Sequence, residues 1–378
     1  MLDSIDEWGP EKVVCVSDRR TGMRGVLVID NTALGMGKGG TRMSPTVSIT
    51  EVARLARNMT WKWAGVDLFY GGAKAGIQAN PDAPDKEQVL RAFARALHNE
   101  VPEEYVFGLD VGLTEADAAI LADEIGGRGG AVGTPYALGG LPYDQLGVTG
   151  YGVAETVDAA AQYAGQDTTS LTVSIQGFGA VGAAAAGRLA ELGATIVAIS
   201  TSQGGLHNPD GLDVEKLLKL RDEHGDALVA HYGDGQPIAC GEEITIPADV
   251  LVPAALQDVI DDDLARTLPA KIIGEGANLP SSPSAQEILR ERGVLVVPDF
   301  IANAGGVVAA AVAMDSRTSG IRPDTTSVFT SISSKLRAGA HNALEVSARE
   351  GMTTHQAARR AAQMRVAEAM DLRGRLPR

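Results

Sequence analysis

The chain has 378 residues, of which 44% are apolar, and this is enough for two domains with separate cores. Its formal net charge of −15 argues against a polyanionic partner such as nucleic acid or an anionic membrane surface. Only two cysteines are present, so neither a disulfide framework nor a cysteine metal cluster is indicated, and we predict no metal site. The first residues lack the basic and apolar regions of a signal peptide, and no apolar run has membrane-spanning length. We therefore expect a soluble, cytoplasmic protein.

The N-terminal part of the sequence mixes strand and helix patterns. Short β-branched runs at 13–16 and 25–29 predict strands. Residues 86–100 carry apolar side chains at helical spacing and predict a helix with one buried face. A stretch rich in glycine and proline, 126–147, interrupts this periodicity and predicts a hinge or interdomain connection.

Two lysines and an aspartate in this part are candidates for catalysis. Lys62 follows Met-Thr-Trp, Lys74 is surrounded by glycines in Gly-Gly-Ala-Lys-Ala-Gly, and Asp110 lies between glycines in Gly-Leu-Asp-Val-Gly. Glycine permits strain and close approach by a ligand, and the apolar residues at 66–70 favour an uncharged amine. We predict Lys74 as a base and Asp110 as its partner carboxylate, which leaves Lys62 to bind a substrate carboxylate. The alternatives are a solvated lysine in a glycine turn and an aspartate that caps the helix near Thr114.

A second lysine surrounded by glycines lies upstream, in the run 35–43. A glycine-dense loop leaves backbone N–H groups available for an anion, and Lys38 adds positive charge. We therefore include Lys38 and Gly39 in the candidate substrate site. The alternative is a flexible loop that carries a solvated lysine.

Beyond residue 147 the pattern changes to that of a dinucleotide-binding unit. A helical pattern at 148–163 precedes an apolar strand at 171–176, an alanine-rich helix that ends near Leu192, and a second strand at 195–199. A Gly-x-Gly-x-x-Gly turn joins the first strand to the helix, and in this βαβ context it predicts nucleotide binding, with an empty turn as the alternative. Its residues are Gly177, Phe178, Gly179, Ala180, Val181 and Gly182.

The cofactor is not decided by the residues that follow the second strand. An NAD site usually has an acidic residue there, whereas this chain has Ser200, Thr201 and Ser202. The missing carboxylate removes repulsion against a 2′-phosphate, and the missing arginine removes attraction. NAD and NADP both remain open, with a slight lean to NADP.

Later segments extend this domain and end in helices. Apolar runs at 250–252, 271–273 and 294–297 predict further strands of the same parallel sheet, and 334–372 has helical spacing with no strand signal. We predict an α/β fold with three parts. They are a substrate-binding and oligomerisation domain (1–145), a Rossmann domain (146–315) and a C-terminal helical segment that returns to the first domain (316–378).

Two asparagines beside small residues complete the candidate cofactor site. Asn278 lies in Gly-Glu-Gly-Ala-Asn and Asn303 in Asn-Ala-Gly-Gly. An asparagine amide both donates and accepts, which suits a carboxamide or a ribose, although a turn role is more common. We also assign Thr201 and Ala255 to the cofactor.

With these motifs assembled, the chain resembles the glutamate/leucine/phenylalanine/valine dehydrogenases over nearly its full length, most specifically at 59–77. The resemblance implies reversible oxidative deamination of an L-amino acid to a 2-oxo acid and ammonia, with NAD or NADP. It implies that Lys74 activates water, that Asp110 moves protons and that Lys62 holds the α-carboxylate. It also places Asn303 where cofactor and substrate meet, has Thr149 contact the nicotinamide, and implies a homo-oligomer, commonly a hexamer.

The resemblance leaves the substrate open. Lys38 followed by two glycines resembles the glutamate enzymes, in which a lysine pairs with the side-chain carboxylate, whereas Thr41-Arg42-Met43 resembles the branched-chain enzymes. Ala310 stands where glutamate enzymes carry a serine, and Ala75 stands where a second glycine is common. A buried lysine without a counter-ion is costly, so glutamate is favoured. The alternatives are a leucine, valine or phenylalanine dehydrogenase and a catalytically silent relative that binds a dinucleotide.

Overall fold

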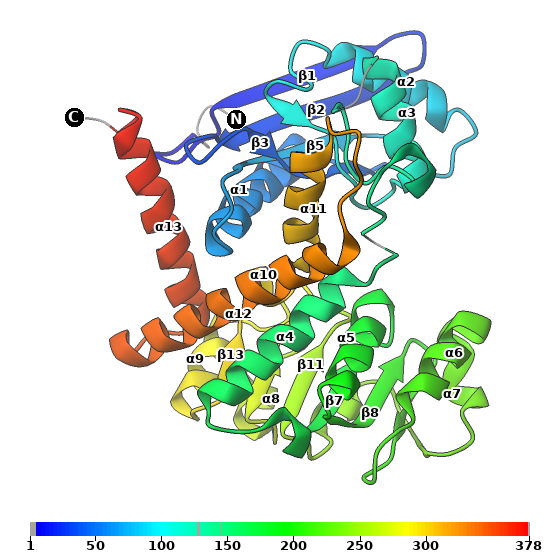
Figure 1. The fold of residues 1–378 in the computed structure, drawn as a ribbon, viewed down its shortest axis with the longest axis vertical. Helices are drawn as coiled ribbons and strands as arrows, with labels where there is room; N and C mark the ends of the chain where they lie inside the picture. The colour runs from blue at the N-terminus through cyan, green and yellow to red at the C-terminus, as the bar shows by residue number, and fades with distance from the viewer. Residues whose placement is uncertain (1–4, 127–128, 144, 377–378) are drawn as a thin grey trace. The chain divides into compact units, whose positions relative to one another are not determined.

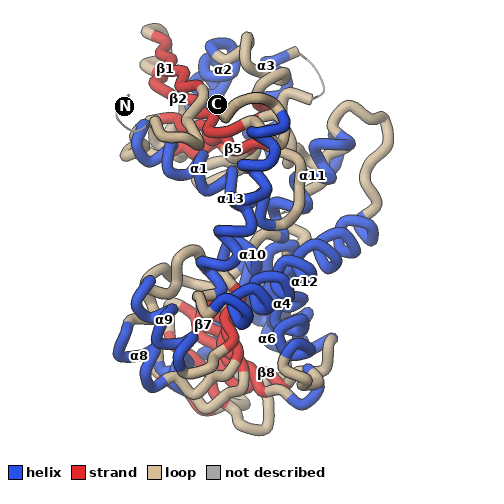
Figure 2. The backbone as a smooth tube through the Cα atoms, turned by 90° about the vertical axis from the view of Figure 1, so that its left-hand side faces the viewer, coloured by secondary structure: helices blue, strands red, loops and turns tan. Residues whose placement is uncertain are grey.

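The computed structural model describes residues 5–126, 129–143 and 145–376. The chain forms two compact units, and the boundary between them is crossed more than once. The first unit comprises Met1–Gln145, Val307–Val328 and Ala361–Arg378, and the second comprises Leu146–Gly306 and Phe329–Arg360. In Figure 2 the strands of each unit gather into one group with helices beside it.

A six-stranded mixed sheet forms the first unit, with the order β1-β2-β5-β3-β6 and β4 paired with β5. Its strands are β1 (Lys12–Asp18), β2 (Met23–Asn31), β3 (Gly37–Lys38), β4 (Thr41–Met43), β5 (Gly71–Ile77) and β6 (Tyr105–Val106). The helices of this part are α1 (Ile49–Gly65), α2 (Lys86–Ala96) and α3 (Glu115–Ile125). β2 pairs antiparallel with β1 and β5, whereas β3 and β4 run parallel to β5. The strands predicted at 13–16 and 25–29 are therefore present.

The glycines around Lys74 have a packing role rather than a turn role. The whole Gly71–Ile77 segment is strand β5, and α1 packs against it. A Cβ on Gly72 would lie 2.0 Å from the hydroxyl oxygen of Thr60, and one on Gly76 would lie 2.6 Å from a methyl carbon of Val52. The solvated glycine turn is therefore wrong, because these residues let helix and strand approach closely.

The second unit has a seven-stranded sheet in the order β10-β9-β8-β7-β11-β12-β13. From β8 onward along this order the neighbouring strands are parallel, while β9 and β10 are added antiparallel. The strands are β7 (Thr172–Gln176), β8 (Thr195–Thr201), β9 (Gly204–His207), β10 (Gln236–Ile238), β11 (Val250–Pro253), β12 (Ile272–Gly274) and β13 (Leu295–Val297). The predicted parallel sheet is confirmed, including its three later strands.

Helices connect these strands as a doubly wound fold requires (Figure 1). They are α4 (Val148–Tyr163), α5 (Ala180–Glu191), α6 (Val214–His224), α7 (Leu228–His231), α8 (Asp262–Thr267), α9 (Pro283–Glu291) and α10 (Asp299–Ala302). α4 has the predicted bounds. It packs on α5 through Gly150, whose missing Cβ would lie 2.2 Å from the carbonyl oxygen of Val181.

The C-terminal segment is helical, as predicted, and the division between the two units passes through it. It contains α11 (Gly305–Ser316), α12 (Thr325–Glu350) and α13 (Thr354–Leu372). Residues 307–328 and 361–376 belong to the first unit, and residues 329–360 belong to the second. Each of the helices α11, α12 and α13 continues across a boundary between the units. No helix in the described ranges is long and apolar enough to span a membrane, and a cytoplasmic location stays a prediction.

Candidate functional site

Lys74 and Asp110 lie together in the first unit. Lys74 is in the middle of β5 with a relative exposure of 6%, and its Nζ lies 2.9 Å from Oδ2 of Asp110. Burial raises the pKa of Asp110, but the charges and hydrogen bonds of Lys74 and Arg42 outweigh burial and hold this pKa below its usual range. The carboxylate is thus ionised and within proton-transfer distance of the lysine. Phe69, one of the apolar neighbours expected to enclose Lys74, is instead 68% exposed.

Arg42 is a site residue that sequence reasoning did not assign. Its Nε donates to Oδ2 of Asp110 over 2.9 Å, and its Nη1 donates to Glu51 over 2.7 Å. Asp110 therefore has two cationic partners on one oxygen. The only signal in the sequence is an arginine two residues after the glycine-dense run, and this does not identify its partner.

The alternative role of Asp110 as a helix cap is wrong. α3 begins after Thr114, whose hydroxyl accepts from the N–H of Asp117, while the Asp117 carboxylate accepts from the Thr114 N–H. This capping box satisfies the first turn without Asp110. The carboxylate of Asp110 is left to face Lys74 and Arg42.

Lys38 is buried in the same sheet. Its relative exposure is 2%, and its Nζ donates to the carbonyl oxygens of Val106 (2.9 Å) and Phe107 (3.1 Å). Burial, together with the charges of Lys74 and Arg317, lowers the pKa of Lys38 to about 7. A buried ammonium held only by carbonyl oxygens is one that a nearby carboxylate would stabilise.

The loop around Lys38 is partly built into the sheet. This run contains β3 and β4, and the N–H groups of Gly37, Thr41 and Met43 donate to the carbonyl oxygens of Glu104, Gly108 and Val111. Gly39 is required by packing, because a Cβ there would lie 1.7 Å from the carbonyl oxygen of Ala73. The close packing of this loop therefore positions Lys38.

Lys62 is in the last turn of α1, between the buried side chains of Trp61 and Trp63. Trp63 Nε1 donates to the carbonyl oxygen of Lys38 over 2.9 Å, so this turn of α1 is held beside β3. α1 thus brings Lys62 and Lys38 into one neighbourhood.

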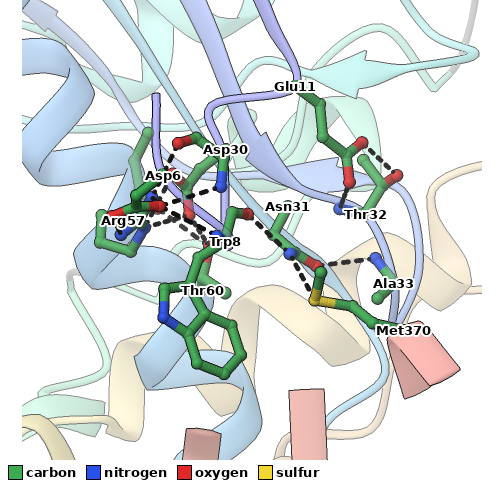
Figure 3. Close-up of polar contacts among 12 residues, drawn as sticks. Asp6, Trp8, Glu11, Asp30, Asn31, Thr32, Ala33, Arg57, Thr60 and Met370 are labelled. Atoms are coloured by element: carbon green, nitrogen blue, oxygen red, sulfur yellow. Dashed lines mark hydrogen bonds and ion pairs between the residues drawn. The ribbon is translucent and has the colours of Figure 1, made fainter. Parts of the chain in front are cut away.

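A polar network fixes α1 through Arg57 and Thr60, which lie five and two residues before Lys62 (Figure 3). Arg57 Nε donates to both carboxylate oxygens of Asp30, and its Nη atoms donate to Asp6. The hydroxyl of Thr60 donates to Asp30 over 2.6 Å. Asp30 is in β2, so these contacts tie α1 to the sheet that carries the other lysines.

Ala310 lies on α11, beside the buried ring of Trp63. Arg317 lies two turns further along the chain, just after this helix, and its charge contributes to the lowered pKa of Lys38. Its Nε is buried and has no hydrogen-bond partner within the described residues. Ala310 therefore has apolar neighbours, and Arg317 contributes a cation near Lys38.

In the second unit, the glycine turn after β7 fits a dinucleotide. Gly177 has a φ of +84°, and a Cβ on Gly182 would lie 1.9 Å from the carbonyl oxygen of Gly177, so both need glycine. A Cβ on Gly179 would meet nothing within 4 Å, which leaves open space at the N-terminus of α5. Oε1 of Gln176, directly before the turn, is buried and lacks a partner among the residues described. These features match a turn that receives a pyrophosphate through backbone N–H groups.

Other predicted cofactor residues adjoin this turn. A Cβ on Gly177 would lie 2.6 Å from Cβ of Ala255, so Ala255 abuts the turn. Phe178 is 1% exposed and can offer only its backbone. Thr201 is also buried, and its hydroxyl donates to the carbonyl oxygen of Asp226, so its side chain serves the protein's own structure.

Asn278, Asn303 and Thr149 form a second group in this unit. Nδ2 of Asn303 donates to Oδ1 of Asn278 over 3.0 Å and to two carbonyls of the same loop. A Cβ on Gly306 would lie 3.5 Å from the hydroxyl of Thr149. The fold therefore brings these three residues to one region, with the Asn303 amide holding the loop that carries Asn278.

A group of potential metal ligands beside this loop is occupied by hydrogen bonds. Glu275, Asp299 and His355 place ligand atoms within 4.8 Å of one another. His355 Nε2 lies 2.6 Å from Glu275, Asp299 accepts from the N–H of Leu279, and Glu275 accepts from Ser281. Burial lowers the pKa of His355, but Glu275 outweighs it and the net shift is upward. We interpret this group as a brace for the loop.

Comparisons with known proteins identify the family of the chain. Residues 10–126 match the family described as Glu/Leu/Phe/Val dehydrogenase, dimerisation domain, and residues 139–374 match Glutamate/Leucine/Phenylalanine/Valine dehydrogenase. A glutamate dehydrogenase of Aeropyrum pernix is 40% identical over 291 residues, which cover 74% of this chain and 68% of the relative. An NADP-specific glutamate dehydrogenase of Saccharolobus shibatae is 36% identical over 337 residues, covering 84% and 79%.

Solved structures are similar over almost the whole chain. A hetero-hexameric glutamate dehydrogenase of Thermus thermophilus in a leucine-bound form has a TM-score of 0.84 at 30% identity, covering 97% of this chain and 91% of the other. A glutamate dehydrogenase of Peptoniphilus asaccharolyticus has a TM-score of 0.85 at 26% identity, covering 97% and 92%. The chain therefore belongs to the glutamate/leucine/phenylalanine/valine dehydrogenase family and is an NAD(P)-dependent amino-acid dehydrogenase.

Proposed function

We propose that this enzyme interconverts L-glutamate with its 2-oxo acid and ammonia. The observation that carries the choice of glutamate is Lys38, a buried ammonium. Among the described residues it donates only to carbonyl oxygens, and it therefore favours a ligand with a carboxylate. Glutamate supplies such a carboxylate on its side chain, and an aliphatic amino acid does not. The named relatives at 36–40% identity support the same substrate.

The Lys74 and Asp110 pair has the geometry for the proton transfers. When bound, the nicotinamide cofactor accepts hydride from the substrate α-carbon during oxidation. Lys74 then activates the water that attacks the resulting imine carbon, and Asp110, 2.9 Å away, exchanges protons with Lys74 and the amino group. One water is consumed and ammonia leaves. Arg42 keeps Asp110 ionised between turnovers.

Lys62 is proposed to bind the α-carboxylate. It is carried on the turn of α1 that contacts the Lys38 backbone, so the two lysines can address the two ends of a dicarboxylate. Asn303 and Thr149 are proposed to meet the nicotinamide, as the family resemblance implies. The turn at Gly177–Gly182 is proposed to hold the pyrophosphate.

Ala310 is the observation that favours a second substrate class. It contributes a methyl group, rather than a hydroxyl, beside Trp63 and Val307, which would suit an aliphatic side chain. The charge of Arg317 near Lys38 opposes this choice. We therefore keep leucine and valine as the competing substrates in the test.

The assembly is proposed to be a homo-oligomer, with a hexamer favoured. The support is family membership and a similar Thermus thermophilus enzyme that is hexameric, although that enzyme is a hetero-hexamer. Light scattering of the purified chain tests the proposal. A monomer, or assembly only after a second chain is added, would refute it.

Steady-state assays test the activity itself. Oxidation of NADH and NADPH is followed with ammonia and the 2-oxo acids of glutamate, leucine, valine and phenylalanine. We expect the highest kcat/KM with the glutamate-derived acid. A higher value for an aliphatic acid would refute glutamate, and binding of either cofactor without any turnover would identify a catalytically silent relative.

A further inference from the structure

The end of β8 is where a βαβ unit reads the ribose of its dinucleotide. β8 ends at Thr201, and the glycine turn touches this end directly. The N–H of Phe178 donates to the carbonyl oxygen of Ser200 over 2.6 Å, and the N–H of Gly177 donates to the Ser200 hydroxyl over 3.0 Å. Ser202 is therefore the first exposed residue beyond the strand beside the turn.

A carboxylate reaches this position from a different part of the chain. The hydroxyl of Ser202 donates to Oδ2 of Asp226 over 2.5 Å, and both residues are exposed. Asp226 lies in a short 3₁₀ helix, Gly225–Ala227, after α6. The hydroxyl of Thr201 donates to the carbonyl oxygen of Asp226 over 2.9 Å. Two consecutive residues at the end of β8 thus fix both the backbone and the side chain of Asp226.

We infer that Asp226, held by Ser202, reads the ribose 2′ position and makes the enzyme select NAD over NADP. A carboxylate accepts a hydrogen bond from a 2′-hydroxyl and repels a 2′-phosphate. Among the described residues Asp226 forms no ion pair, while the neighbouring Arg221 and His224 pair with Asp222 and Glu223, so the Asp226 carboxylate has no direct ionic partner. The inference rests on the proposed cofactor site and replaces the lean to NADP drawn from the sequence.

The test compares kcat/KM for NAD and NADP in the wild-type enzyme and in Asp226→Asn. We expect the wild-type enzyme to prefer NAD by about tenfold or more, the worth of one hydrogen bond to a charged group. Asp226→Asn should lower the NAD/NADP ratio by about tenfold to a hundredfold, through a gain with NADP as well as a loss with NAD. A wild-type preference for NADP, or an unchanged ratio in the variant, would overturn the inference.

Asp210→Asn is the matched control. It removes one exposed negative charge from the same unit, at the opposite end of β8, since a Cβ on the adjacent Gly211 would lie 2.9 Å from Thr195. We expect its NAD/NADP ratio to equal that of the wild-type enzyme. Ser202→Ala keeps the Asp226 carboxylate but removes its side-chain anchor, so the ratio should fall in the same direction by a smaller factor. An equal effect of Asp210→Asn would make the change one of net charge and overturn the inference.

Binding of nucleotide fragments separates this inference from the proposed activity. The probes are 5′-AMP and 2′,5′-ADP, which differ only in the 2′-phosphate, and calorimetry measures their affinities without any turnover. The wild-type chain should bind 5′-AMP more tightly, and Asp226→Asn should narrow or reverse the difference. If the chain lacks dehydrogenase activity but shows this pattern, the proposed function fails and the inference stands. If the chain is active but Asp226→Asn leaves the affinity ratio unaltered, the inference fails and the proposed function stands.

Discussion

Lys74 and Lys38 are two buried lysines in neighbouring strands of one sheet, and their partners differ. Lys74 in β5 faces a carboxylate at 2.9 Å, whereas Lys38 in β3 donates to two carbonyl oxygens. In the described ranges Lys38 forms no ion pair, and its pKa falls to about 7. Burial alone therefore does not define the role of a lysine. A paired lysine can exchange a proton, while an unpaired one favours a ligand that brings the missing charge.

The loop that leads to Asp110 contacts both lysines, but in different ways. A Cβ on Gly108 would lie 2.6 Å from Nζ of Lys38, so glycine lets that amine lie against the loop leading to Asp110 without moving. A Cβ on Gly40 would lie 2.4 Å from the carbonyl oxygen of Leu109. The same short loop thus accommodates one lysine through its backbone and pairs the other through its side chain.

We expect the largest effect on turnover from removing the Asp110 carboxylate, which pairs with Lys74. Asp110→Asn keeps the shape of the side chain but removes the carboxylate shared with Arg42. We expect kcat to fall by about 10³-fold, within the range for a lost proton carrier, with little change in NADH affinity. Steady-state kinetics and a direct binding measurement check both parts.

Asp123→Asn provides the comparison for that experiment. Asp123 is exposed in α3 and pairs with Arg91, so the substitution alters charge without reaching Lys74. Its kcat should match that of the wild-type enzyme. If Asp110→Asn retains normal turnover, the aspartate has no part in proton transfer and the contrast between the two lysines loses its catalytic meaning.

Removing Lys38 should affect substrate choice more than chemistry. Lys38→Met removes the ammonium and keeps an apolar chain of similar reach. We expect kcat/KM for glutamate to fall by about a hundredfold, consistent with one lost partner of a buried charge pair, while the value for leucine stays the same or rises. Lys12→Met, on the exposed edge strand β1, is the matched control. Equal losses for glutamate and leucine would place Lys38 outside the side-chain pocket.

Changing the pH removes the charge of Lys38 gradually, so it tests the same role of Lys38 with a smaller expected effect. With a pKa of about 7 in the free enzyme, Lys38 is charged at pH 6 and mostly neutral at pH 9. The ratio of kcat/KM for glutamate to that for leucine should therefore fall as pH rises above 7, by up to about tenfold per pH unit. Using the ratio cancels any effect of pH on the Lys74 and Asp110 pair, which both substrates share. A ratio independent of pH would mean that glutamate does not depend on the Lys38 charge.

The elements that could be predicted from the sequence are those whose pattern lies within a short stretch of chain. The helix at 148–163 and the strands around the Gly177 turn follow from periodicity and from glycine requirements that act within a few residues. Side-chain pairs whose members are distant in sequence could not be predicted. Arg42 reaches Asp110 across 68 residues, and Asp226 reaches Ser202 across 24, so neither spacing is visible as a motif. From the sequence, the glycines beside Lys74 are interpreted as space for a ligand. Their packing role is visible only in the structure, because the contact of α1 with β5 is a tertiary contact.

The stability of the fold should also depend on pH through Lys38. The folded-state pKa of Lys38 is about 7, against an ordinary value of 10.5, so between these values the unfolded chain binds more protons. Wild-type stability should therefore rise with pH across this window, by about 3 kcal/mol between pH 7 and pH 9.5, relative to Lys38→Met, which lacks the group. Urea midpoints at fixed protein concentration measure the difference.

The difference in stability between the wild-type chain and Lys38→Met at a single pH does not test this prediction. Methionine also leaves the carbonyl oxygens of Val106 and Phe107 without their donor. Only the change with pH isolates the titration, since those lost hydrogen bonds cost the same at pH 7 and pH 9.5. Lys12→Met should show no such change, because the raised pKa of Lys12 keeps that lysine charged throughout the window. A parallel pH course for Lys38→Met and the wild-type chain would mean that Lys38 holds its proton up to its ordinary pKa. In that case a counter-ion accompanies Lys38 even without substrate, and it no longer differs from Lys74.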